Sequence, residues 1–294
     1  MPFLFLNDIP TRLNLVRIYE VQPRNFEKIL LFCYYKDEME EKNIILNNLL
    51  THYYAWKNPG RGSCALLFLH GWRSGGAVWF PIIPALLQQT SCDIYTLDLP
   101  GFGKSQTPPS SFSLDDYREI IKAFVQKLGL ARVVLVGHSF GGRITIKCAT
   151  AYPNFFQKIV LVDSAGVRMR DKNLRTKNLI AKIVKPFFRL PLISRLRKPL
   201  YGVIGSEDYL ATPELREVFV SIINEDLQPL LSGINAKTLI VWGENDDVTP
   251  IEAAEIMQKE IPHAELTILP DAGHFSFLDQ KEKFINTLVQ FLNI

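Results

Sequence analysis

The chain has 294 residues, a length that suits one large α/β domain or two small ones. Hydrophobic residues make up 47% of it and charged residues 21%, so it can bury a sizeable core and is not disordered throughout. The net charge of +3 is too small for a protein that coats nucleic acid, and the sequence holds no apolar run of the roughly 18 residues that span a membrane.

The first 43 residues form an N-terminal extension whose packing the sequence does not indicate. Their start, MPFLFLNDIP, is apolar but lacks the basic stretch and the small-residue cleavage site of a signal peptide. The four cysteines (Cys33, Cys64, Cys92 and Cys148) are not spaced as metal-ligand pairs. We therefore expect reduced thiols, no bound metal and a cytoplasmic protein.

Beyond the extension, strand and helix patterns alternate along the chain. Strands are predicted at residues 44–56 (two short strands with a turn at Asn47 and Asn48), 64–71, 93–100, 132–137, 158–164, 237–243 and 264–270. Helices are predicted at residues 77–89, from Ser113 to Gly129, from Phe140, at 250–261 and from Gln280. This alternation predicts an α/β fold with a parallel, doubly wound sheet.

Residues 165–232 interrupt the alternation, because they hold several helical patterns and no convincing strand. We expect a helical insertion here, with residues 44–164 and 233–294 forming the core. From Gly166 to Gly205 the insertion carries eleven Lys and Arg residues and one acid, Asp171. Residues 182–200 mix these cations with Phe, Leu and Ile, as membrane-interface segments do. The insertion either contacts an anionic membrane or an anionic substrate, or is a solvated cap whose cations face an acidic core.

The sequence GHSFG at residues 137–141 stands directly between a predicted buried strand and a predicted helix. In that setting G-x-S-x-G forms a tight turn that lifts the serine clear of the sheet, at a helix N-terminus. Ser139 is therefore the candidate nucleophile, and the alternative is a structural serine in a turn. The backbone N–H groups of Phe140 and Trp72 are the candidate donors to an oxyanion, since one follows the nucleophile and the other follows strand 64–71.

A serine nucleophile needs a base, and the base needs an acid to orient it. His274 follows the last predicted strand, at the sheet edge where open α/β folds bind ligands. The other histidines lie in a hairpin, at a strand end, beside the nucleophile and in a late loop: His52, His70, His138 and His263. Asp246 is the favoured acid, with its neighbour Asp247 and the strand-end Asp163 as alternatives.

Five motifs, in this order and spacing, resemble the α/β-hydrolase superfamily: HGW (70–72), DLPGFGKS (98–105), GHSFGG (137–142), WGENDD (242–247) and AGHFSF (272–277). The resemblance covers residues 44–294. It implies an eight-stranded, mostly parallel sheet, a triad of Ser139, Asp246 and His274, and a helical cap of residues 165–232 inserted after the sixth strand. Asp98, Gly101, Gly103 and Ser105 match a turn that shapes the sheet. The serine at the nucleophile position separates the chain from relatives that attack with aspartate.

The resemblance also implies a reaction, hydrolysis of a carboxylic ester or related acyl bond of a small-to-medium apolar substrate, with no cofactor. A carbon–carbon hydrolase of the ring-cleavage-product type is the runner-up, since those relatives share the triad and the position of the cap. Thioesters and lipid esters are further possible substrates. A non-catalytic small-molecule binding protein on the same fold is the alternative outside the enzymes.

Overall fold

The computed structural model describes residues 39–58, 64–168 and 213–293. Residues 1–38 of the expected extension lie outside this part. The part of the basic segment 166–205 that follows Arg168 also lies outside it, as does the centre of the expected cap. In the described part of the insertion, residues 165–168 and 213–232, the regular elements are all helical.

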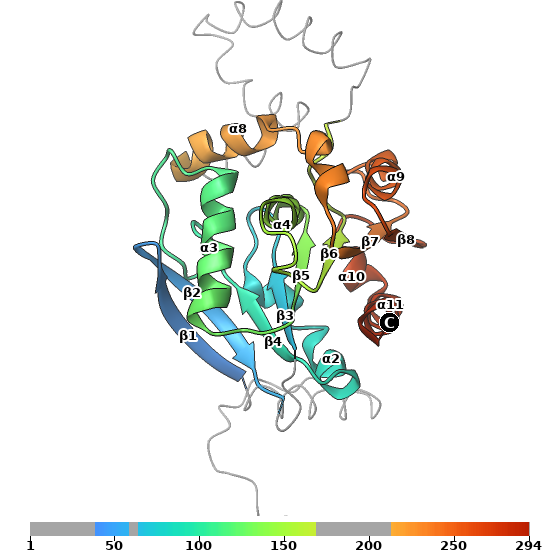
Figure 1. The fold of residues 1–294 in the computed structure, drawn as a ribbon, viewed down its shortest axis with the longest axis horizontal. Helices are drawn as coiled ribbons and strands as arrows, with labels where there is room; N and C mark the ends of the chain where they lie inside the picture. The colour runs from blue at the N-terminus through green and yellow to red at the C-terminus, as the bar shows by residue number, and fades with distance from the viewer. Residues whose placement is uncertain (1–38, 59–63, 169–212, 294) are drawn as a thin grey trace, which may run out of the picture. The chain divides into compact units, whose positions relative to one another are not determined.

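Eight strands form one sheet in the order β1-β2-β4-β3-β5-β6-β7-β8 (Figure 1). The strands are β1 (Met39–Leu46), β2 (Leu49–Trp56), β3 (Ala65–Leu69), β4 (Asp93–Leu97), β5 (Val133–His138), β6 (Lys158–Val162), β7 (Lys237–Gly243) and β8 (Ala264–Leu269). β2 pairs antiparallel with β1 and with β4, and every other pairing is parallel. The expected eight-stranded, mostly parallel sheet is confirmed.

Helices cover both faces of the sheet, which explains why every residue of β3, β5 and β6 is buried. One buried apolar cluster joins the sheet to α3 (Leu114–Lys127), α4 (Phe140–Ala151), α8 (Arg216–Asn224) and α9 (Ile251–Glu260). A second cluster lies against α2 (Ile83–Gln89), α10 (Ser276–Asp279) and α11 (Lys281–Asn293). Short 3₁₀ turns complete the set: η1 (Gly76–Trp79), η4 (Pro213–Leu215) and η5 (Gln228–Gly233).

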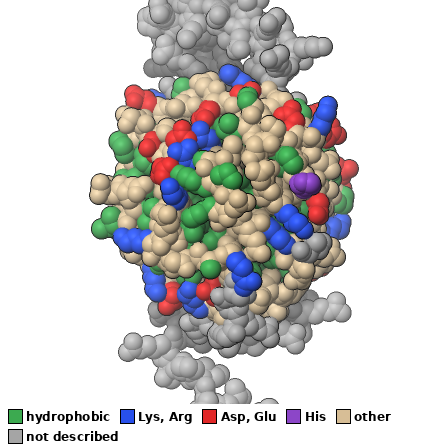
Figure 2. Space-filling model, in the orientation of Figure 1, with side chains coloured by type: hydrophobic (Ala, Val, Ile, Leu, Met, Phe, Trp, Pro, Cys, Tyr) green, Lys and Arg blue, Asp and Glu red, His purple; other side chains and the backbone are tan. Residues whose placement is uncertain are grey.

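Two predicted elements differ from the structure. The helix expected at 77–89 is η1 followed by α2, because Pro81 and Pro84 lack the N–H that a continuous helix needs, and Pro84 lies in the first turn of α2. The hairpin begins at Met39 rather than at 44, so most of the charged stretch 36–42 belongs to β1. β1 is an edge strand with residues 40–43 exposed, and charges suit such a strand. On the face viewed in Figure 2, acidic and basic side chains intermingle.

Cys64 and Cys92 form a disulfide at the amino ends of β3 and β4, while Cys148 is buried and free. The expectation of reduced thiols is therefore wrong for this pair. The two residues precede Ala65 and Asp93, which are paired across the strands, and sequence spacing does not reveal that register. Disulfides persist mainly in oxidising compartments, so the cysteines no longer support a cytoplasmic location. That location stays a prediction. In the described ranges no helix is both long and apolar enough to cross a membrane.

Candidate active site

Ser139 occupies the turn between β5 and α4, with φ 50° and ψ −108°. A non-glycine residue rarely adopts a positive φ, and such strained residues gather at functional sites. The turn is held by hydrogen bonds from Ser139 N to Val162 O (3.0 Å) and from Ala165 N to Ser139 O (3.1 Å). Glycine is needed at 141, because a Cβ there would lie 2.4 Å from the carbonyl oxygen of Leu69. The predicted tight turn is present.

Ser139, His274 and Asp246 form one hydrogen-bonded chain, although the sequence separates the first two by 135 residues. His274 Nε2 lies 3.0 Å from Ser139 Oγ, and His274 Nδ1 lies 2.8 Å from Asp246 Oδ2. A carboxylate only accepts hydrogen bonds, so Nδ1 carries the proton and Nε2 is free to accept the serine proton. The structure therefore brings the favoured base and acid together with the candidate nucleophile, in the order that general-base activation requires.

The Asp246 side chain is fully buried and accepts several hydrogen bonds. Val248 N and Thr249 N donate to Oδ1 at 2.8 and 2.9 Å, and Thr249 Oγ1 donates to Oδ2 at 2.5 Å. Burial alone would raise the pKa of Asp246, but the hydrogen bonds from His274 and Thr249 outweigh it and hold the pKa below the usual value. The acid thus stays ionised beside the imidazole.

The two alternative acids occupy other positions. Asp247 is exposed. Asp163 is fully buried at the end of β6, where it accepts hydrogen bonds from Gly243 N (2.8 Å), Ser276 N (3.1 Å) and Ser276 Oγ (2.6 Å), and not from His274. Burial raises the pKa of Asp163 to about 7 against the effect of these donors. Asp163 therefore ties the loop of the base to the end of β7, from which the loop of the acid departs.

The two candidate oxyanion donors belong to segments that meet beside Ser139. A Cβ added to Gly71 would lie 3.4 Å from Ser139 Cβ, so the loop that follows β3 passes close to the nucleophile. The rings of Trp72 and Phe140 pack edge to face with centroids 5.2 Å apart. Both segments thus lie close to Ser139, and the role of their N–H groups as oxyanion donors stays a prediction.

The sequence analysis assigned Asp98 to a structural turn, but it did not predict that Asp98 and His70 hold the loop of Trp72 in place. His70 Nε2 accepts a hydrogen bond from Leu99 N (3.0 Å), so its Nδ1 carries the proton and donates to Gly71 O (2.7 Å). Burial lowers the pKa of His70 to about 4, which keeps the ring neutral in this arrangement. Asp98 accepts from Gly76 N at 2.6 Å and pairs with His52 Nδ1 at 2.8 Å. In the sequence, the only signal for these roles was that His70 and Asp98 each belong to one of the five motifs.

His138 contacts the backbone of the candidate base, His274. Its Nε2 donates to the carbonyl oxygen of His274 (2.7 Å), and burial lowers its pKa to about 3. Its hydrogen bond to the backbone of His274, which crosses 136 residues of sequence, was not foreseen.

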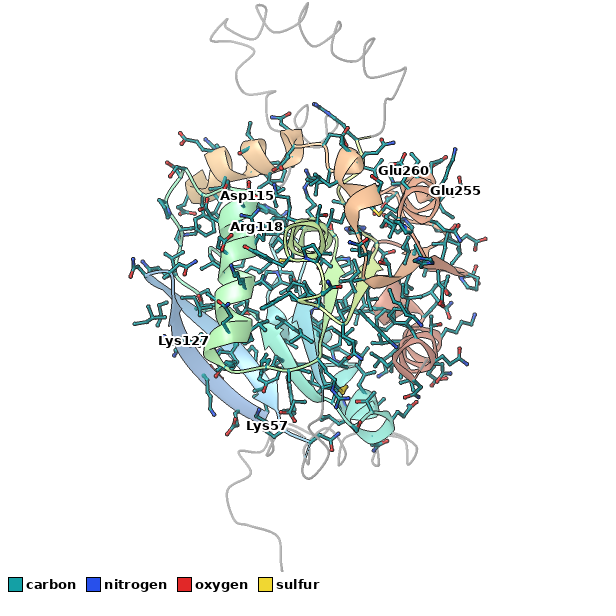
Figure 3. The ribbon with its side chains drawn as sticks, viewed as in Figure 1. Lys57, Asp115, Arg118, Lys127, Glu255 and Glu260 are labelled. Atoms are coloured by element: carbon teal, nitrogen blue, oxygen red, sulfur yellow. A yellow bond between two sulfur atoms is a disulfide. The ribbon has the colours of Figure 1, made fainter. Side chains whose placement is uncertain are left out.

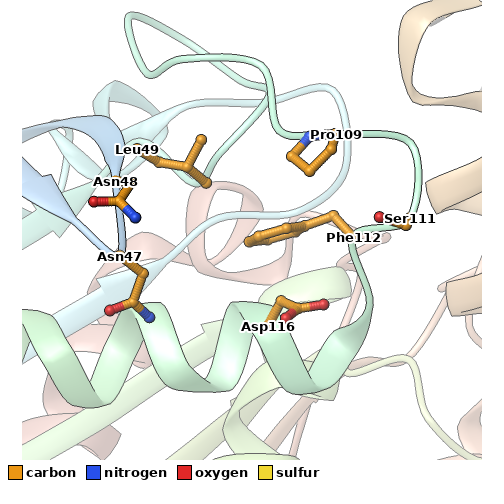
Figure 4. A pocket seen from close by; sticks show the side chains of 7 residues that line it. All are labelled: Asn47, Asn48, Leu49, Pro109, Ser111, Phe112 and Asp116. Carbon is orange, nitrogen blue, oxygen red and sulfur yellow. The ribbon is translucent and has the colours of Figure 1, made fainter.

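The cavity in Figure 4 lies elsewhere, between the β1–β2 turn and the segment that leads into α3. It has a volume of about 350 Å³, and its lining includes Asn48, Phe112 and Asp116 but not the triad residues. The Asp116 carboxylate already accepts from the N-cap residue Ser113, at its N (2.8 Å) and its Oγ (2.6 Å), so the capping group there is satisfied. In the described part of the chain no group of His, Cys, Asp and Glu could hold a metal ion.

Comparison with known proteins places the chain among hydrolases. The model of the alpha/beta hydrolase family matches residues 66–287. The pimeloyl-[acyl-carrier protein] methyl ester esterase of Nitrosomonas europaea is 27% identical over 75% of this chain and 92% of its own. The 2-hydroxy-6-oxononadienedioate/2-hydroxy-6-oxononatrienedioate hydrolase of Escherichia coli is 27% identical over 79% and 88%. A solved structure of a membrane phospholipase A has a TM-score of 0.70 at 23% identity, covering 92% of both chains.

Proposed function

The chain belongs to the alpha/beta hydrolase family, and from that premise we propose that it cleaves a carboxylic ester, or a related acyl bond, through an acyl-enzyme on Ser139. The observation that carries this proposal is the unbroken hydrogen-bonded chain from Asp246 through His274 to Ser139 Oγ. The substrate class is a small-to-medium apolar ester, in keeping with the aromatic rings of Trp72 and Phe140 beside the nucleophile.

The mechanism follows from the protonation states of the three side chains. His274 Nε2 takes the Ser139 proton as Oγ attacks the substrate carbonyl, and Asp246 stabilises the imidazolium that forms. The N–H groups of Trp72 and Phe140 donate to the oxyanion of the tetrahedral intermediate. The alcohol leaves with the proton from His274. Water, activated by the same base, then hydrolyses the acyl-enzyme and regenerates Ser139.

A carbon–carbon hydrolase is the second candidate. The Escherichia coli relative favours it, because its similarity to this chain equals that of the esterase. A binding protein with an idle triad is the candidate outside the enzymes. Membrane contact by the basic segment 166–205 also stays a prediction, and co-sedimentation with anionic vesicles at low and high salt tests it.

Labelling with a fluorophosphonate probe tests the proposed nucleophile. We expect the wild type to be labelled and Ser139→Ala not to be, with ester turnover lower by several orders of magnitude. Ser164→Ala is a matched control, because Ser164 is a buried serine near the same turn whose hydroxyl donates to Ala165 O instead. Labelling that persists in Ser139→Ala would refute the assignment. A labelled enzyme that cleaves a vinylogous 1,5-diketo acid but no ester would favour the carbon–carbon hydrolase.

A further inference from the structure

Helix α8 crosses the carboxyl-end side of the core, above α3 and α4 in Figure 1, and contacts it at three places. At its start, Leu215 packs on the turn at Gly101, where an added Cβ would lie 2.8 Å from Leu215 Cδ1. In its middle, the ring of Phe219 lies 5.0 Å from that of Trp72. At its end, it meets Arg143 of α4.

Arg143 is buried on α4, one helical turn beyond Ser139. Its Nη2 donates to Ile222 O at 2.6 Å and also to Glu225 O. Carbonyls at the end of a helix carry partial negative charge, so a guanidinium is a strong partner for them. Burial lowers the pKa of Arg143 to about 10, opposed by Glu225 and Asp226, so the group is cationic at neutral pH.

Lys147 adds a second connection from α4, one turn further along. Its Nζ pairs with the Glu225 carboxylate at 2.9 Å and with Asp115 at 2.8 Å. Figure 3 shows Asp115 and Arg118 on the end of α3 that lies beneath α8. Lys147 contacts only carboxylates here, whereas Arg143 holds the backbone of α8 itself. The orientation of α8 is therefore set from the helix that carries the nucleophile.

The ring of Trp72 contacts Phe140 of the nucleophile turn and Phe219 of α8, with centroids 5.2 and 5.0 Å away. Phe219 is only partly buried, so part of its ring is open to a bound molecule. The Trp72 ring thus connects Phe219 of α8 with the turn that carries Ser139.

We propose that Arg143 is a positioning residue that fixes α8 so that Phe219 limits the length of the acyl chain that binds beside Trp72. This assignment rests on the proposed hydrolysis at Ser139. The readout is the ratio of kcat/KM for p-nitrophenyl octanoate to that for p-nitrophenyl acetate. Phe219→Ala should raise this ratio about tenfold or more, since extra methylenes gain room in an apolar pocket. Val220→Ala is the matched control on α8, because Val220 is 41% exposed and should leave the ratio unchanged.

Arg143→Met removes the charge at similar length and should raise the ratio in the same direction. If Arg143 acts through Phe219, the double variant should match Phe219→Ala alone, because the two changes share one effect. Arg143→Lys keeps a cation and should show a smaller shift, which also provides a test if the Met variant does not fold. A lowered melting temperature with an unchanged ratio, or effects that multiply in the double variant, would overturn the proposal. Failure of fluorophosphonate labelling in the wild type would instead overturn the hydrolysis at Ser139.

Discussion

Replacing Asp163 by asparagine should change how the stability of the protein depends on pH. The Asp163 carboxyl is fully buried at the end of β6, and burial raises its pKa from 3.8 to about 7. A carboxyl whose pKa is higher in the folded state binds protons more tightly there than in the unfolded chain. Its contribution to stability is therefore present at low pH and is lost as the pH rises through the range from about 4 to 7.

The size of this effect follows from the shift. A rise of about three pKa units corresponds to about 4 kcal/mol across the full range. Between pH 5 and pH 8, where the unfolded carboxyl is already ionised, linkage gives a loss of about 2.5 kcal/mol. An asparagine side chain does not titrate, so the Asp163→Asn variant should lack this component while keeping every other pH-dependent group.

Urea unfolding of both proteins at pH 5 and pH 8 measures the difference. The free energy of unfolding of the wild type should fall between the two pH values by about 2.5 kcal/mol more than that of Asp163→Asn. Ser276→Ala is a useful second variant, because it removes one donor to the carboxylate and should raise the Asp163 pKa further. Parallel pH profiles for the wild type and Asp163→Asn would show that Asp163 is ionised throughout, and would refute the reasoning.

Two further predictions concern the hydroxyl of Thr249, which contacts the candidate acid, and the Cys64–Cys92 disulfide, which lies far from the candidate active site. Thr249→Val removes the hydroxyl that donates to the Asp246 carboxylate at 2.5 Å, so kcat for an ester should fall by about tenfold. An unchanged kcat would show that the hydroxyl is dispensable. Replacing Cys64 and Cys92 by Ala should lower the free energy of unfolding by about 3.5 kcal/mol for the 28-residue separation, because the disulfide restricts the unfolded chain. Since the disulfide lies at the amino ends of the strands and the triad at the carboxyl ends, kcat for an ester should be unchanged in this variant. Dithiothreitol should destabilise the wild type but not the double variant, and two free thiols in the non-reduced wild type would contradict the bond.

The parts of the fold and site that the sequence predicts are those fixed by local chemistry. β7 begins and ends at the predicted residues 237 and 243, because an uninterrupted buried apolar run, Leu239 to Trp242, forms its centre. The turn at Ser139 was predictable for a similar reason, since G-x-S-x-G has this geometry when a buried strand precedes it and a helix follows it. His274 and Asp246 could be chosen because the carboxyl ends of parallel strands gather at one edge.

The parts that the sequence does not predict depend on contacts between distant segments. The Cys64–Cys92 bond depends on strand register, and the hydrogen bond from His138 to the backbone of His274 depends on how two loops fold together. Arg143 is a further case, because a basic residue in a helix is ordinarily expected to face solvent. Its burial becomes intelligible only when the carbonyls at the end of α8 lie against it.

Two residues of the proposed relay, Asp246 and His274, are held in place by polar neighbours. Thr249 orients Asp246, His138 holds the backbone of His274, and Asp163 joins the loop of the base to β7. Hydrogen bonds of this kind are costly to leave unmade in a buried site, so each neighbour restricts the relay to one geometry. Loops alone would leave the three side chains free to separate. The geometry of the site therefore depends on these polar groups, and the proposed acyl-chain preference depends on the position of α8, which Arg143 contacts.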